Sequence, residues 1–128
     1  MLYKEDIIKI LKDIDLPLSE YWITSGEALV IHGVKEGTND IDLGCTTNLI
    51  EHFLRKGCNY KVTEDNSRIM EITDTIELLK NWFVDEIEFI DGLPIGSLEI
   101  IKTQKTELGR EKDITDIRII DEYLKNKR

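Results

Sequence analysis

Asp40 and Asp42 are the residues of this chain whose type and spacing are best suited to chemistry. They alternate with the apolar residues Ile41 and Leu43, which predicts a half-buried strand with both carboxylates on one face. On such a strand their backbone origins lie roughly 6.5–7 Å apart. A pair of this kind can bind one divalent cation or bridge two, and phosphoryl-transfer sites hold two ions roughly 3.5–4 Å apart, normally with a third carboxylate. By itself, an Asp-x-Asp strand is more often a solvated face.

A tight turn at Ser25-Gly26 precedes the aspartates. The aromatic and β-branched run 21–24 predicts a short strand before it, and the run 27–32 is compatible with a helix after it. A turn between a strand and a helix can present backbone N–H groups and a hydroxyl to phosphate oxygens, with the helix contributing the positive end of its dipole. The small residues Ser25 and Gly26 let a phosphate approach closely.

Helices and strands interleave along the chain. Apolar periodicity and capping residues predict helices over residues 5–14, 27–32, 49–57, 75–82, 97–109 and 111–124. Alternation predicts strands over 21–24, 40–43, 60–63, 68–72 and 86–90, the last ending at the turn Asp91-Gly92. This order predicts an α/β fold in which a mixed β-sheet is flanked by helices.

The composition favours one acidic domain. The 128 residues suit a single core, so residues 1–128 are predicted to form one domain. The net charge of −9 argues against broad nucleic-acid binding, although local basic patches are compatible with it. The chain has no apolar stretch long enough to span a membrane and its first residues do not resemble a signal peptide, so a cytoplasmic protein without membrane association is expected. Cys45 and Cys58 lack metal-ligand spacing and are predicted to be reduced thiols.

Three segments together resemble the signature of the nucleotidyltransferase superfamily, whose palm is shared with DNA polymerase β. They are the runs 23–29, 32–33 and 38–43. Family members have an apolar strand, a Gly-Gly or Gly-Ser turn, a short helix ending in His-Gly, and an Asp-apolar-Asp pair on the next strand. The chain is most similar to the small, single-domain branch, which includes minimal nucleotidyltransferases and related toxin or antitoxin proteins. A C-terminal pattern also matches the family: Ser97-Leu98-Glu99, Lys105, Gly109-Arg110 and Lys112-Asp113.

The resemblance implies a site with two magnesium ions. Asp40 and Asp42 would bind them, and Glu71 is the best match for the family's third carboxylate. Asp85 and Glu88 are rival candidates, because the strand around them also alternates. Glu71 is preferred since the family places its third carboxylate before a helix. A glutamate there is one carbon longer than the aspartate of the family.

The resemblance also implies which residues bind a nucleoside triphosphate. Ser25, Gly26 and Thr38 would meet its phosphates at the turn and the following loop. Lys105 and Arg110 would meet them from the helical side, although a solvated helix face explains these two residues equally well. The first glycine of the family's turn is Ser25 here, which adds a Cβ where an unusual φ angle is expected.

Two functions follow from this resemblance. The first is metal-dependent transfer of a nucleotidyl group from a nucleoside triphosphate to a hydroxyl of a protein, an RNA or a small molecule, with release of pyrophosphate. The alternative is a non-catalytic interaction module of the same fold, for example one component of a toxin–antitoxin pair with a cognate partner protein. The short chain favours the alternative, because larger nucleotidyltransferases use extra domains to hold the acceptor. A third reading is a structural domain in which the Asp pair is coincidental.

Overall fold

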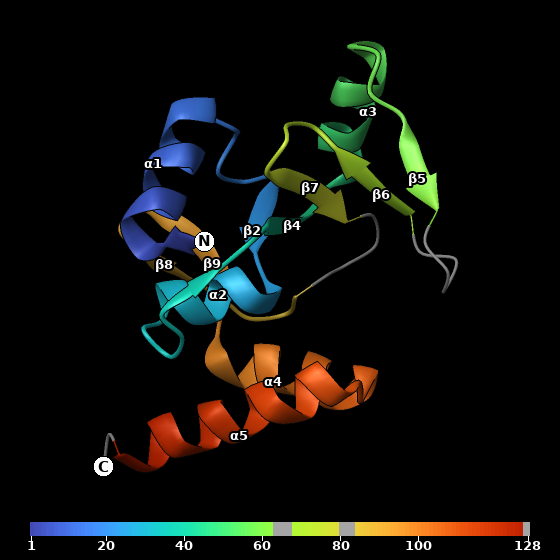
Figure 1. Ribbon diagram of the computed structural model, residues 1–128. Helices are drawn as coiled ribbons and strands as arrows, with labels where there is room; N and C mark the ends of the chain where they lie inside the picture. The colour runs from blue at the N-terminus through green and yellow to red at the C-terminus, as the bar shows by residue number, and fades with distance from the viewer. Residues whose placement is uncertain (63–67, 80–83, 127–128) are drawn as a thin grey trace.

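The computed structural model describes residues 1–62, 68–79 and 84–126, and its main feature is a mixed seven-stranded sheet (Figure 1). The strand order is β5-β6-β7-β4-β2-β9-β8. The seven strands are β2 (Tyr21–Ile23), β4 (Ile41–Cys45), β5 (Tyr60–Val62), β6 (Arg68–Glu71), β7 (Ile76–Leu79), β8 (Ile87–Ile90) and β9 (Leu93–Gly96). Two short strands, β1 (Leu2–Tyr3) and β3 (Gly37–Thr38), pair separately.

In the described ranges five helices accompany the sheet, and two of them begin at residues whose side chains cap the helix. They are α1 (Lys4–Ile14), α2 (Ser25–Ile31), α3 (Thr47–Arg55), α4 (Leu98–Leu108) and α5 (Glu111–Asn126). The side chains of Thr46 and Ser97 accept hydrogen bonds from backbone N–H groups at the starts of α3 and α4, as N-caps do. In Figure 1, α4 and α5 lie together at the end of the molecule opposite α3. The predicted fold class, a mixed sheet with helices, is confirmed.

The central strands are held in register by apolar residues. Strand β4 runs antiparallel to β2, with Leu43 opposite Ile23, and parallel to β7. Strand β2 in turn runs parallel to β9, with Ile23 opposite Ile95. These three side chains are fully buried, so a shift of one residue would turn them out of the core. The same register aligns Asp42 of β4 with Glu77 of β7.

The helix predicted over residues 75–82 is wrong where the structure describes it, because residues 76–79 form strand β7. Ile76 and Leu78 are buried while Glu77 and Leu79 are half-buried, which is the period of a strand. The hydroxyl of Thr73 accepts hydrogen bonds from the N–H groups of residues 75 and 76 and closes a turn at this point. A short apolar run is compatible with either element until its neighbours are known. Trp82, which was predicted on this helix, lies outside the described residues, as do Thr63 and the C-terminal pair 127–128.

Strand β9 was not predicted, because its sequence Leu-Pro-Ile-Gly contains two residues that weaken strands. It is joined to β8 by the predicted turn Asp91-Gly92, whose φ angles are +52° and +80°. Two positive φ angles are typical of the tight turn that matches the twist of a hairpin. The paired strands β1 and β3 were also not predicted, since each has only two residues.

Two further predictions can be compared with the structure. Cys45 and Cys58 are both free, as expected, and burial raises the pKa of the Cys45 thiol to about 12. Among the described residues, no helix combines the length and the hydrophobicity required to cross a bilayer.

Candidate active site

A cleft of about 510 Å³ lies between the turn that begins α2, the loop that leads to β4, and the α4–α5 hairpin. Both predicted aspartates and all five predicted nucleotide-binding residues line this cleft, whereas Glu71 does not. The lining residues are Ser25, Gly26, Glu27, Lys35, Thr38, Asn39, Asp40, Asp42, Lys105, Arg110, Lys112, Thr115 and Asp116. The fold thus brings together segments that lie far apart in the sequence, from residue 25 to residue 116.

The Ser25-Gly26 turn has a backbone conformation that usually favours glycine, as expected from the glycine at this position in the turn that the sequence resembles. Ser25 has a φ angle of +62°, in the left-handed region. This conformation costs a residue with a Cβ roughly 1–2 kcal/mol. A Cβ built on Gly26 would lie 3.4 Å from Oγ1 of Thr38, so the loop packs closely against the turn. The serine is therefore accommodated, with local strain at the wall of the cleft.

Glu27 fixes the position of Asp42 and was not singled out by the sequence. Its Oε1 atom accepts a 2.8 Å hydrogen bond from the backbone N–H of Asp42. The Glu27 residue is 1% exposed, and burial, followed by the charge of Asp42, raises its pKa well above the usual range. A carboxylic acid directly before the apolar run 28–31 was the one local signal for this role.

Glu77 lies beside Asp42 and is the third acidic residue of this part of the sheet. The parallel pairing of β4 with β7 places the two residues opposite each other, and the nearby Glu77 side chain opposes the rise in the pKa of Asp42. Burial, followed by the charge of Asp40, raises the pKa of Asp42. Burial also raises the pKa of Glu77, with further contributions from Asp42 and Asp40. Burial and neighbouring carboxylates thus favour the protonated forms of Asp42 and Glu77.

The three residues considered for the third carboxylate lie elsewhere. Glu71 is opposite Glu77 on β6, one strand further from Asp42, and its exposed side chain pairs with Lys61. Glu88 is on β8, which two strands separate from β4, and its Oε1 lies 3.5 Å from Nε2 of His32. Asp85 is exposed in the segment before β8. Glu77 was missed because residues 75–82 were assigned to a helix.

Lys105 is held inside the cleft wall by carboxylates of α5. Its Nζ atom lies 3.0 Å from Asp116 Oδ2 and 3.6 Å from Asp113 Oδ1, and the residue is only 5% exposed. Its charge also acts on Glu27, where it opposes the rise in pKa. A buried ammonium that is already paired twice is rigid, so Lys105 gives the cleft a fixed positive charge.

Arg110 and Lys112 supply the more accessible positive charges. Arg110 donates two side-chain hydrogen bonds to the Asp113 carboxylate, one of 2.6 Å from Nε and one of 3.2 Å from a terminal nitrogen. The Arg110 side chain is nevertheless half exposed. Lys112 is exposed at the start of α5. The charges of both residues lower the pKa of Asp42, although burial and Asp40 outweigh them. Lys112 was part of the family pattern but was not predicted as a site residue.

Two solved structures are similar to this chain over most of its length. ANT(2″)-Ia, solved in complex with adenylyl-2″-tobramycin, is 20% identical with a TM-score of 0.55, over 94% of this chain and 86% of that one. A candidate nucleotidyltransferase from Thermotoga maritima is 19% identical with a TM-score of 0.60, over 99% of this chain and 97% of that one. This chain has the nucleotidyltransferase fold.

The nucleotidyltransferase fold confirms the architecture that the sequence resemblance predicted. No protein-family model and no curated protein sequence matches this chain. The likeness therefore lies in the arrangement of the backbone.

The acidic residues of this nucleotidyltransferase fold suit a hard cation, because they offer only carboxylate oxygens. Within the described ranges, no three His, Cys, Asp or Glu side chains already converge as metal ligands. The observation that favours a cation is electrostatic: the charge of Asp40 raises the pKa values of Asp42 and Glu77, and the charge of Asp42 also raises that of Glu77. A divalent ion can offset the repulsion among these carboxylates.

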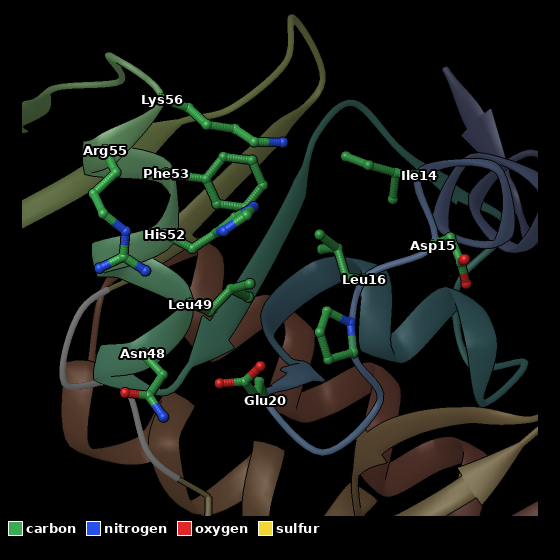
Figure 2. Close-up of a pocket in the computed structure, with 11 residues that line it drawn as sticks. Ile14, Asp15, Leu16, Glu20, Asn48, Leu49, His52, Phe53, Arg55 and Lys56 are labelled. Atoms are coloured by element: carbon green, nitrogen blue, oxygen red, sulfur yellow. The ribbon is translucent and has the colours of Figure 1, made fainter.

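A second cavity, of about 450 Å³, lies away from the acidic cleft (Figure 2). It is bounded by the segment between α1 and β2 and by one side of α3, and Glu20, directly before β2, lines it. Ser25 of the acidic cleft comes shortly after β2, so the two cavities are lined by residues at opposite ends of this strand. Figure 2 shows Lys56 extended past the ring of Phe53, with its Nζ atom 5.9 Å from the ring centre. None of the predicted site residues lines this cavity.

Proposed function

We propose that this protein is a metal-dependent nucleotidyltransferase that moves a nucleotidyl group from a nucleoside triphosphate to a hydroxyl of an acceptor. The observation that supports the proposal is the single cleft that contains the Ser25-Gly26 turn, the Asp40/Asp42 pair and two accessible cations. In this arrangement negative carboxylates face positive side chains across one space. That charge pattern is suited to a polyphosphate carried with a divalent cation.

The residues of the cleft have separable tasks in this proposal. The Ser25-Gly26 turn and the hydroxyl of Thr38 bind phosphate oxygens, and Arg110 and Lys112 neutralise charge on the leaving pyrophosphate. The acceptor oxygen forms a bond to the α-phosphorus while the bond from that phosphorus to the bridging oxygen breaks. A carboxylate oxygen of Asp42 or Glu77 receives the proton of the acceptor hydroxyl.

Asp40, Asp42 and Glu77 are the residues that would hold magnesium, with Glu71 kept as the alternative third ligand from the sequence. Magnesium, when bound, supplies positive charge to the triphosphate and orients it. Glu27 acts indirectly, because its hydrogen bond to the backbone of Asp42 fixes the strand that carries both aspartates. Most of the acceleration would come from positioning and charge stabilisation.

Transfer from α-phosphate-labelled nucleoside triphosphates tests the proposal. The purified protein is incubated with each of the four triphosphates, magnesium, and candidate acceptors that include itself, RNA and small polyols or aminoglycosides. Label transfer by the wild type and by the surface control Asp13→Asn, together with its loss in Asp42→Asn, is the expected result. Labelling that persists in Asp42→Asn would reject this site.

The second candidate function is a nucleotidyltransferase-fold interaction module without catalysis, for example one half of a toxin–antitoxin pair. The observation that favours it is the pairing of Lys105 and Arg110 with Asp113 and Asp116, which partly neutralises these cations. The module predicts no transfer with any acceptor, together with binding to a cognate protein. A cytoplasmic location is compatible with both functions and stays a prediction.

A further inference from the structure

Strand β8 lies at one edge of the seven-stranded sheet, and two of its apolar side chains are exposed to solvent. In the described part of the chain, it pairs only with β9. Ile87 is 42% exposed and Phe89 is 64% exposed, although both belong to a strand. Edge strands in natural proteins usually carry lysine, proline or a bulge that blocks further pairing. The strand Ile-Glu-Phe-Ile has no lysine or proline, its register with β9 is continuous, and its one charged residue is the acidic Glu88.

The register shows which backbone groups point outward. The N–H of Ser97 donates to the carbonyl of Glu86 at 3.1 Å, and the tight turn pairs Ile90 with Leu93. Hydrogen-bonded positions alternate along an antiparallel pair. The backbone N–H and C=O groups of Glu86, Glu88 and Ile90 therefore point toward β9. The N–H and C=O groups of Ile87 and Phe89 therefore point to the free edge. They are available to an added strand.

The two faces of this edge differ in chemistry. Ile87 and Phe89 lie on one face and form an apolar pair. Glu86 and Glu88 lie on the other face, where they line a cavity of about 540 Å³ together with Glu99 of α4. An incoming strand would thus meet apolar side chains on one side and carboxylates on the other.

We propose that the outer edge of β8 binds an extended segment of a partner protein in which apolar and basic residues alternate. The segment adds one strand to the sheet by backbone hydrogen bonds to Ile87 and Phe89. Its apolar side chains pack on these two residues, and its lysine or arginine side chains lie opposite Glu86 and Glu88. Opposite charges across a strand pair stabilise it, whereas like charges directly opposite each other destabilise it.

The same charges disfavour a second copy of this chain at the edge. Antiparallel pairing of β8 with itself through both Ile87 and Phe89 places Glu88 directly opposite Glu88 of the other copy. The Cβ atoms of these two like-charged residues would be about 4.5–5.5 Å apart on one face, and the net charge of −9 adds repulsion between the chains. The partner is therefore a different, basic segment. This inference does not depend on nucleotidyl transfer.

Fluorescence anisotropy with a labelled peptide, Gly-Val-Lys-Val-Lys-Val-Gly, tests the proposal on the full chain. We expect saturable binding, with an affinity at least about tenfold higher than that of the same peptide with glutamate in place of lysine, equivalent to about 1.4 kcal/mol. Phe89→Ser and Glu88→Lys should each weaken binding by about tenfold or more. The matched controls are Val62→Ser on edge strand β5 and Glu51→Lys on α3, which should bind as the wild type does.

A second peptide separates strand addition from charge attraction alone. Methylation of the backbone nitrogens of its valines keeps the lysines but removes donors that the added strand needs, and it should abolish binding. Equal binding of the methylated peptide would overturn the proposal, as would absence of saturable binding by the first peptide. Because this comparison uses only the wild-type chain, it holds even where Phe89→Ser fails to fold.

Discussion

The backbone N–H of Asp42 donates a hydrogen bond of 2.8 Å to Oε1 of the buried residue Glu27. This bond joins the first turn of α2 to the strand segment that carries the aspartates. The Ser25-Gly26 turn and the acidic pair are therefore held in a fixed relative position. A buried hydrogen bond of this kind matters most when it is removed, because an unpaired buried N–H loses its contacts with water as well.

Two substitutions of Glu27 should distinguish the effect of its hydrogen-bond-accepting oxygen from the effect of its negative charge. Glu27→Ala leaves the Asp42 N–H unpaired and should lower the free energy of unfolding by about 2–3 kcal/mol in urea denaturation. Glu27→Gln keeps an amide oxygen as acceptor and should cost less than about 1 kcal/mol. The exposed control Glu51→Ala should change little. Equal losses for alanine and glutamine would show that the acceptor oxygen is not the stabilising feature.

Magnesium should stabilise the folded chain through Asp40 and Asp42 of the cleft and the neighbouring Glu77. We expect added MgCl₂ to raise the melting temperature of the wild type and of Asp13→Asn, because a bound cation relieves the repulsion among Asp40, Asp42 and Glu77. The double variant Asp40→Asn, Asp42→Asn should show no such rise. NaCl at matched ionic strength controls for screening. Equal shifts in wild type and double variant would remove the metal site from this cleft.

The third magnesium ligand can be assigned by comparing Glu77 on β7 with Glu71 on the neighbouring strand β6. Glu77→Gln should abolish the magnesium-dependent rise in melting temperature, since Glu77 lies directly opposite Asp42 on the neighbouring strand. Glu71→Gln should leave most of the rise intact, because the Glu71 side chain pairs with Lys61. The reverse result would restore Glu71 to the role that the sequence resemblance suggested. Label transfer by the same two variants gives an independent measurement.

The parts of the cleft that could be predicted from sequence are those with local signals. Asp40 and Asp42 alternate with apolar residues, and the Ser25-Gly26 turn interrupts an apolar strand, so both features are visible within a few positions. Helices α1, α3, α4 and α5 were found for the same reason, because capping residues and helical periodicity are local.

The parts that were missed depend on pairing between distant segments. Glu77 lies beside Asp42 only because β7 adds to β4 in parallel, and nothing within residues 75–82 reveals that register. Glu27 likewise acquires its role from a backbone N–H fifteen residues away. Strand β9 exists because β8 and β2 pair with its two sides, although Pro94 and Gly96 weaken it locally.

Asp113 should make the α4–α5 hairpin sensitive to acid. Burial by itself would raise the pKa of this carboxyl, but hydrogen bonds and charge from Arg110, together with Lys105, leave it below the ordinary value of 3.8. A lowered pKa means that the stabilisation is complete above pH 3.8 and is lost as the pH falls through the folded-state pKa.

Asp113→Asn should cost about 3 kcal/mol of unfolding free energy at pH 7, because it leaves Lys105 and Arg110 short of a partner. The cost should shrink as the pH falls below 3.8, which urea denaturation at each pH measures. Asp121→Asn, which breaks only an exposed pair with Lys102, should cost about 0.5 kcal/mol or less at pH 7. A loss at Asp113 that stays constant down to pH 2 would mean that packing, and not the charge, holds the hairpin together.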